Sequence, residues 1–146
     1  MPEQNIEVCI LAAGMGSRMR SSRPKVLQKL AGRPLLAHLL DTLEGLEPSS
    51  IHVVIGEGSD LIQAEFADTG NVNWVMQAER KGTGHAIMQA AVHFSAESKI
   101  IILLGDAPLI SLDTLTSLAQ LDCDLGVLTV DMDEPDNYGR IIRDAK

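Results

Sequence analysis

Short apolar runs alternate with amphipathic stretches along most of the chain. Residues 7–12, 51–55 and 99–104 are nearly continuous apolar runs, which are typical of parallel strands buried on both faces. Residues 34–44 and 84–94 instead carry apolar side chains at helical spacing. This alternation of strand and helix predicts an α/β domain with a doubly wound, mostly parallel sheet. The run 99–104 (KIIILL) is the most apolar, so we expect it to be a central strand.

Five further segments complete the predicted order of elements. Residues 59–66 are expected to form a helix and residues 73–77 a short strand. Ser111 can accept a hydrogen bond from the first amides of a helix that follows it. Residues 125–130 and 138–142 are predicted to be two more strands.

Composition and charge narrow the classes of partner. The 146 residues suit one domain, and the net charge of −8 leaves no basic surface for nucleic acid or an anionic membrane. The N-terminus lacks the pattern of a signal peptide, and no apolar run reaches the ~18 residues of a membrane span. We therefore expect a cytoplasmic protein that binds neither nucleic acid nor membrane. Cys9 and Cys123 form no disulfide framework, and Cys9 is interpreted as a small buried apolar residue.

A glycine-containing turn follows the first predicted strand, in the sequence Leu-Ala-Ala-Gly-Met-Gly-Ser-Arg (residues 11–18). Small residues let backbone amides approach a phosphate, and Arg18 and Lys25 add positive charge. The dinucleotide-binding fingerprint needs a glycine where Met19 stands, so an NAD-binding protein is disfavoured. A bare Gly-x-Gly after a strand is also compatible with an ordinary turn between a strand and a helix.

Four blocks of sequence, in order, resemble one enzyme family. They are LAAGMGSRM with RPKVL (residues 11–19 and 23–27), QAERKGTGHA (77–86), GDAPLI (105–110) and NYGR (137–140). The first resembles the signature of sugar-phosphate nucleotidyltransferases. The second and fourth narrow the resemblance to the bacterial UDP-N-acetylglucosamine pyrophosphorylases, the uridylyltransferase half of a bifunctional enzyme.

The resemblance implies a reaction and a set of site residues. UTP and N-acetylglucosamine 1-phosphate would give UDP-N-acetylglucosamine and pyrophosphate, with Mg²⁺ as cofactor. Asp106 would be a carboxylate ligand of Mg²⁺, while Arg18 and Lys25 would neutralise the triphosphate. Gly105 and Gly139 would lie against the sugar. The nucleotide would be bound by Leu11, Ala12, Ala13, Gly14, Gly16, Gln77, Gly82 and Thr83.

Three features complicate this transfer of roles. Arg80 stands where the family usually has a second glutamine beside the base, and Leu104 stands where a tyrosine is common. His85 is interpreted only as a polar residue near the start of a helix. Base selectivity and sugar contacts therefore remain open at this point.

The family domain is longer than this chain. We therefore expect residues 1–146 to be the N-terminal nucleotide-binding part of the pyrophosphorylase domain, with the acetyltransferase β-helix absent. Such a part would be inactive or weakly active, and its incomplete sheet could self-associate. Two alternatives remain open, another sugar-1-phosphate nucleotidyltransferase and a non-catalytic nucleotide-binding module.

Overall fold

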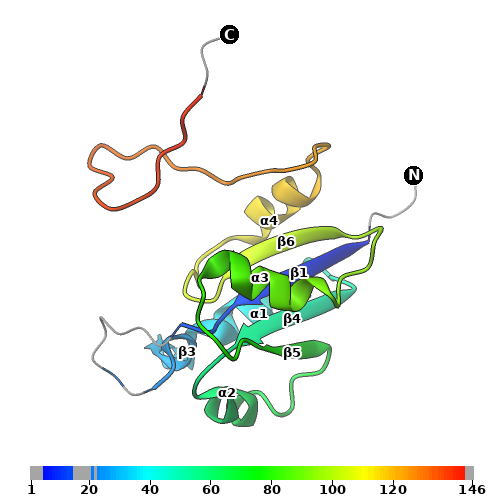
Figure 1. Cartoon of the computed structure of the whole chain (residues 1–146), viewed down its shortest axis with the longest axis vertical. Helices are drawn as coiled ribbons and strands as arrows, with labels where there is room; N and C mark the ends of the chain where they lie inside the picture. The colour runs from blue at the N-terminus through cyan, green and yellow to red at the C-terminus, as the bar shows by residue number, and fades with distance from the viewer. Residues whose placement is uncertain (1–4, 15–20, 22, 144–146) are drawn as a thin grey trace.

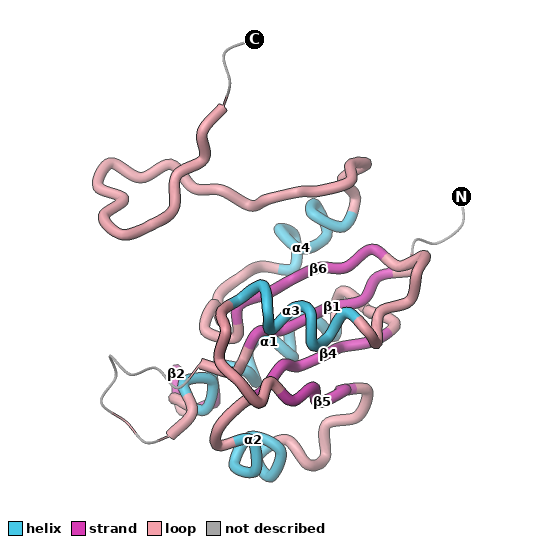
Figure 2. The backbone as a smooth tube through the Cα atoms, viewed as in Figure 1, coloured by secondary structure: helices cyan, strands magenta, loops and turns pink. Residues whose placement is uncertain are grey.

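The computed structural model describes residues 5–14, 21 and 23–143, and these form an α/β domain around a parallel sheet (Figures 1 and 2). Strand β1 (Ile6–Leu11) pairs on one side with β4 (Ser50–Ile55) and on the other with β6 (Lys99–Leu104). Strand β5 (Val72–Met76) pairs with the outer side of β4. The predicted doubly wound, mostly parallel sheet is confirmed.

Helices cover both faces of the sheet. Helix α3 (Thr83–Ala91) lies on one face, in front of β1 and β4 in Figure 1. Helices α1 (Leu35–Glu44), α2 (Ser59–Glu65) and α4 (Leu112–Ala119) contribute to the core on the other face. Successive residues of a strand point to opposite faces, so the two apolar cores draw on alternate positions of the same strands.

A short connection after β1 fixes the position of Lys25. A 3₁₀ turn, η2 (Lys25–Leu27), buries Val26 and Leu27 and leaves Lys25 partly exposed. The hairpin of β2 (Lys29–Leu30) and β3 (Arg33–Pro34) then leads into α1. Its two-residue turn is left-handed at both positions, as a tight hairpin requires.

The order of the strands defines where a ligand would bind. The chain passes from β1 outward to β4 and β5, and then returns to the other side of β1 to form β6. The connection after β1 therefore leads to one side of this strand, and the connection after β5, which carries α3, returns the chain to its other side. In open α/β sheets the crevice at such a reversal, beyond the carboxyl ends of the strands, is the usual ligand site.

Strand β6 was predicted to be central but lies at an edge of the described sheet. Its Ile101 and Leu103 face the α1 and α4 side and are buried. Its Ile102 and Leu104 face the α3 side, where they are 46% and 54% exposed. The sequence correctly indicates that both faces of this strand are apolar. Helix α3, however, packs over β1 and β4 and leaves Ile102 and Leu104 exposed.

The two strands predicted at 125–130 and 138–142 are wrong, because both segments are irregular in the structure (Figure 2). A strand needs a neighbour for its backbone hydrogen bonds, and these segments pair with none of the described strands. Their apolar side chains are exposed, among them Leu125, Val127, Val130, Tyr138, Ile141 and Ile142. Self-association through the incomplete sheet stays a prediction.

Several local predictions are confirmed. The hydroxyl of Ser111 accepts a hydrogen bond from the backbone N–H of Thr114 at 3.2 Å and so caps α4. Cys9 is fully buried and Cys123 is exposed. In the part of the chain that the structure describes, no helix combines the length and apolarity needed to cross a membrane.

Candidate functional site

The carboxyl ends of β1 and β6 are joined directly by their backbones. The N–H of Gly105 donates to the carbonyl oxygen of Leu11 at 2.9 Å, and the N–H of Ala12 donates to Val54 at 2.8 Å. The turn that begins at Leu11 therefore leaves the sheet at the point where the chain reverses its winding. The backbone of Leu11, Ala12, Ala13 and Gly14, predicted to hold the nucleotide, lies at this ligand-binding edge.

Gly105 is required by packing at this edge. A methyl group added to its Cα would lie 2.8 Å from Cγ1 of Val26 and 3.0 Å from the carbonyl oxygen of Leu11. Real Cβ atoms do not approach other atoms this closely, so any side chain here would push η2 away from β1. The predicted sugar contact of Gly105 stays a prediction, whereas its packing role is a property of the fold.

The same packing brings Lys25 and Asp106 together. Nζ of Lys25 forms an ion pair with Oδ2 of Asp106, and both side chains are about one-third exposed. Val26, which follows Lys25, is buried against Gly105, which precedes Asp106. The ion pair therefore lies directly over the end of β6. The cation predicted to bind phosphate thus lies against the carboxylate predicted to bind Mg²⁺.

Asp106 could hold a metal only with help from the substrate. Among the described residues, no group of three His, Cys, Asp or Glu side chains is close enough to hold a metal ion. Mg²⁺ commonly keeps several waters and is held by one or two carboxylates together with substrate phosphates. The accessible carboxylate of Asp106 fits that arrangement when a nucleotide phosphate lies beside it.

Gln77 lies where β5 ends, next to the end of β4. Its backbone N–H donates to the carbonyl of Ile55 at 2.8 Å, and its side chain is 4% exposed. Its Nε2 lies 3.3 Å from the carbonyl oxygen of Gly82 and 3.0 Å from Nδ1 of His85. The amide that was predicted to read uracil is thus held in place by the residues at the start of α3.

Gly82 and Thr83 form the entry to α3. Gly82 has φ = +95°, which favours glycine, and Thr83 is the first residue of the helix. Both residues are exposed, and the first amides of the helix beyond them lack intrahelical partners by geometry. Their predicted nucleotide contacts are sterically open, and they stay predictions.

Two neighbours of the site were not found from the sequence. Gly56 was not singled out, yet a methyl group on it would lie 3.3 Å from both Cβ and O of Ala13. Its small size lets the loop after β4 pack against the turn after β1. Beside it, Nη2 of Arg80 donates to Oε2 of Glu57 at 2.8 Å, so the arginine that replaces the family's glutamine is paired with a carboxylate.

Three predicted site residues have no described place at this edge, two of them because the structure does not describe them. Gly16 and Arg18 lie outside the described residues. Gly139 lies in the irregular segment after α4, drawn orange to red in Figure 1, which extends away from the sheet. The segment that carries Gly139 therefore forms no part of the described site.

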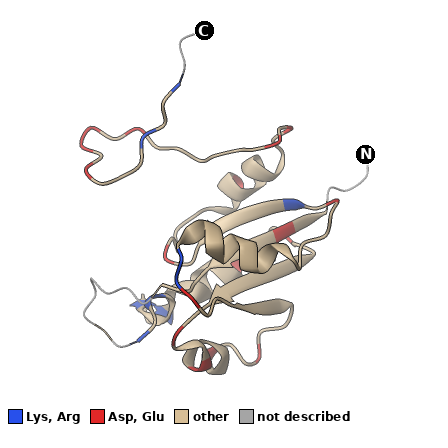
Figure 3. Ribbon diagram, in the orientation of Figure 1, with Lys and Arg blue, Asp and Glu red and all other residues tan. Residues whose placement is uncertain are grey.

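The positive charge near the site comes mainly from the connection after β1. Figure 3 shows Lys and Arg gathered around the β2–β3 hairpin, on the side toward which the strands run. Acidic residues are more scattered over the rest of the ribbon. Several of these cations are paired with carboxylates, as Arg33 is with Asp41 and Arg23 with Glu65.

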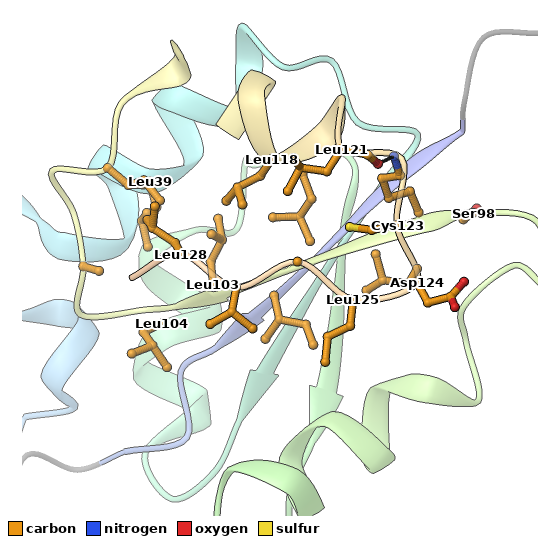
Figure 4. Close-up of a pocket in the computed structure, with 18 of the residues that line it drawn as sticks. Leu39, Ser98, Leu103, Leu104, Leu118, Leu121, Cys123, Asp124, Leu125 and Leu128 are labelled. Carbon is orange, nitrogen blue, oxygen red and sulfur yellow. Dashed lines mark hydrogen bonds between the residues drawn. The ribbon is translucent and has the colours of Figure 1, made fainter. Parts of the chain in front are cut away.

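A groove of about 860 Å³ lies elsewhere, between β6 and the segment that follows α4 (Figure 4). It is lined mostly by apolar side chains, with Leu103, Leu104, Leu118, Leu125 and Leu128 around it in Figure 4. Such a lining offers little to a triphosphate, because its one cation, Lys99, already donates to the carbonyl oxygens of Ala119 and Leu121. This groove is therefore not the candidate nucleotide site.

At the opposite end of the sheet, Glu7 and His52 form a buried, hydrogen-bonded pair. Oε2 of Glu7 lies 2.9 Å from Nε2 of His52, and Oε1 accepts hydrogen bonds from the Ser98 hydroxyl and the Ser95 backbone. Burial alone would raise the pKa of Glu7, but the hydrogen bonds from Ser98, Ser95 and His52 lower it to about 2. This pair lies at the amino ends of β1 and β4, so its role is structural.

Comparison with known proteins agrees with the geometry of this edge. Residues 8–136 match the family model of the MobA-like NTP transferase domain. The chain is 54% identical over 142 residues to the "Bifunctional protein GlmU" of Pseudomonas paraeruginosa, and 48% identical over 141 residues to that of Xanthomonas oryzae. These matches cover 96% and 97% of this chain but 31% of each relative. The resemblance to the bifunctional family, based on the four sequence blocks, is confirmed.

Solved structures support the fold. The inositol-1-phosphate CTP transferase of T. maritima aligns with a TM-score of 0.70 and 24% identity, over 82% of this chain and 50% of that chain. Rv0371c of Mycobacterium tuberculosis aligns with a TM-score of 0.69 and 22% identity, over 81% of this chain and 60% of that chain. At these identities the likeness is one of fold.

Proposed function

The chain belongs to the family of MobA-like NTP transferase domains, and from this membership we propose that it is the nucleotide-binding part of a uridylyltransferase. The proposed reaction of the whole protein joins UTP and N-acetylglucosamine 1-phosphate into UDP-N-acetylglucosamine and releases pyrophosphate. The relatives that carry the name GlmU support this substrate pair. The chain spans 31% of their length, so for this chain alone we propose nucleotide binding.

The observation that carries the proposal is the Lys25–Asp106 pair at the end of β6. It consists of one cation and one carboxylate, the proposed metal ligand, beside the turn after β1, where a parallel sheet reverses its winding. The negative charge of a nucleoside triphosphate must be neutralised before another phosphate can approach it. The cation does this directly, and the carboxylate would do it by holding Mg²⁺.

The proposed chemistry is a displacement at phosphorus. An oxygen of the sugar phosphate forms a bond to the α-phosphorus of UTP. The bond from that phosphorus to the oxygen that bridges it to the β-phosphorus breaks, and pyrophosphate leaves with this oxygen. The attacking phosphate is already ionised at neutral pH, so no side chain has to remove a proton. The protein contributes by positioning the two substrates and by stabilising charge on the transferred group.

Each residue then has a definite task. The backbone amides from Leu11 to Gly14 would bind and orient the nucleotide, and Arg18 and Lys25 would neutralise the phosphates. Asp106 would hold Mg²⁺, which supplies further neutralisation of the triphosphate when it is bound. Gln77, Gly82 and Thr83 would contact uracil and ribose.

Calorimetric titration of the chain with UTP, CTP and ATP in the presence of Mg²⁺ tests the proposal. We expect UTP to bind in preference to ATP, and Arg18→Ala and Gln77→Ala each to weaken UTP binding by about tenfold or more. Lys29→Ala is the matched control, since Lys29 is an exposed cation of the β2–β3 hairpin. A chain that circular dichroism shows to be folded and that binds none of the three nucleotides would contradict the proposal.

A further inference from the structure

Resting on the proposed function, we propose that His85 is a positioning residue that fixes the amide of Gln77 and thereby sets the preference for uracil over cytosine. The two side chains are joined by a hydrogen bond of 3.0 Å between Nε2 of Gln77 and Nδ1 of His85. Gln77 is buried at the end of β5, whereas His85 lies in the first turn of α3. The contact therefore links the strand that carries the base-reading amide to the helix that follows the base-binding loop.

The orientation of the Gln77 amide follows from its neighbours. An amide side chain can rotate to exchange its oxygen and its nitrogen, so its orientation must be decided by the hydrogen bonds available. The carbonyl oxygen of Gly82 lies 3.3 Å from Nε2 and can only accept a hydrogen bond. The NH₂ group must therefore face Gly82, and no donor among the described residues contacts Oε1 of Gln77.

His85 reinforces this orientation only in one tautomer. To accept from Gln77, Nδ1 must carry a lone pair, so the ring proton of the neutral imidazole resides on Nε2. Gln89, one turn further along α3, has its amide nitrogen Nε2 3.4 Å from Nε2 of His85, and exchanging the two ends of this amide would place its oxygen toward that proton. Two acceptors, Gly82 O and His85 Nδ1, then hold both hydrogens of the Gln77 NH₂ group.

A fixed amide oxygen selects the base by its ring nitrogen. Uracil has an N–H at its N3 position, which can donate to Oε1 of Gln77. Cytosine has a lone pair at N3, which would face the same oxygen and repel it. A freely rotating glutamine could serve both bases by exchanging its ends, so discrimination depends on the contacts that prevent rotation. Removing the acceptor at residue 85 should relax selectivity without destroying the pocket.

Three variants of the full chain test this inference, each titrated with UTP and with CTP. His85→Phe keeps a planar ring but removes the acceptor, and we expect the ratio of UTP to CTP affinity to fall about tenfold. His85→Asn restores an acceptor near the position of Nδ1 and should recover most of the ratio. His93→Phe is the matched control, because His93 lies beside His52 at the other end of the sheet, and it should leave the ratio unchanged.

A purely structural role for His85 would weaken the binding of UTP and of CTP equally. An unchanged affinity ratio in His85→Phe would therefore overturn the inference. UTP binding by the wild type would still leave the proposed function intact. A wild-type chain that binds neither nucleotide overturns both. The tautomer is a second measurement that needs no ligand. Nitrogen-15 spectra of the histidine rings at about pH 8, where free imidazole is neutral, should show the proton of His85 on Nε2. A proton on Nδ1 would contradict the inference.

Discussion

The ammonium group of Lys25 forms an ion pair with the carboxylate of Asp106, although 81 positions of sequence separate the two residues. The contact exists because Val26 packs against Gly105, so each charged residue is the neighbour of a packing residue. In the proposed enzyme the two charges have different ligands, phosphate and Mg²⁺. The pair therefore balances the site electrostatically before the nucleotide arrives.

This pairing predicts two different effects on nucleotide binding. Lys25→Ala should lower UTP affinity about tenfold both with and without Mg²⁺, because a phosphate-binding cation is lost. Asp106→Asn should instead remove the increase in affinity that Mg²⁺ gives, while binding without Mg²⁺ stays the same or improves. Titrations with Mg²⁺ and with EDTA measure both effects. Equal losses for the two variants under both conditions would contradict the separate roles.

Gly105→Ala should destabilise the fold. The new methyl group would lie 2.8 Å from Val26 Cγ1 and 3.0 Å from Leu11 O, and only the side chain can move easily. We expect a loss of about 1–3 kcal/mol in the free energy of unfolding, measured by urea denaturation. Gly70→Ala is the control, since a methyl group there meets nothing within 4 Å and should change stability by less than about 1 kcal/mol. Similar results for both variants would mean that η2 does not pack on β6 as described.

The Glu7–His52 pair predicts acid sensitivity. The pKa of Glu7 is lowered from 4.5 to about 2 in the folded chain, so its ionised form stabilises the fold above about pH 4.5. That contribution, on the order of 3 kcal/mol, should be lost as the pH falls from about 4.5 to about 2. Glu7→Gln should lower stability at neutral pH and flatten this part of the pH profile.

Urea unfolding at several pH values between neutrality and pH 3 measures the effect. Glu97→Gln is the matched control, because Glu97 is exposed, and it should follow the wild-type profile. An unchanged acid dependence in Glu7→Gln would show that other carboxylates account for it.

Strand β6 allows a test of which of its faces is buried. Leu103 is 6% exposed and packs in the core on the α1 and α4 side, whereas the adjacent Leu104 is 54% exposed. Leu103→Ala should cost about 2–5 kcal/mol of unfolding free energy, and Leu104→Ala less than about 1 kcal/mol. The two thermal or urea midpoints give the comparison. A large cost at Leu104 would mean that this face is covered in solution.

The two cysteines should differ in reactivity. Burial raises the pKa of the Cys9 thiol to about 11, so almost none of it is thiolate at neutral pH, while Cys123 is exposed. A chromogenic disulfide reagent should modify one thiol of the folded chain, and the second only when denaturant is added. Mass spectrometry of the first product should place the label on Cys123. Labelling of Cys9 at a similar rate would contradict the burial of β1.

The elements that were predicted correctly could be recognised from the pattern of neighbouring residues alone. The apolar runs at β1 and β4, the helical spacing of α1 and the serine cap of α4 are properties of neighbouring residues. The α/β class follows from their order, since alternating strands and helices have few compact arrangements. The sequence also placed Lys25, Gln77 and Asp106 in motifs of the right family, because motif residues are read without knowing their contacts.

Only the tertiary structure decided which segments meet. The apolar pattern of β6 could not reveal that it lies at the edge of the described sheet, because burial of each face depends on distant helices. Residues 125–130 have the composition of a strand but lack a partner, and strand pairing is a long-range interaction. The contacts of Lys25 with Asp106 and of Gln77 with His85 likewise depend on where separate elements pack. Neighbouring residues were therefore enough to predict most of the elements, whereas long-range packing decided which chemical groups lie together.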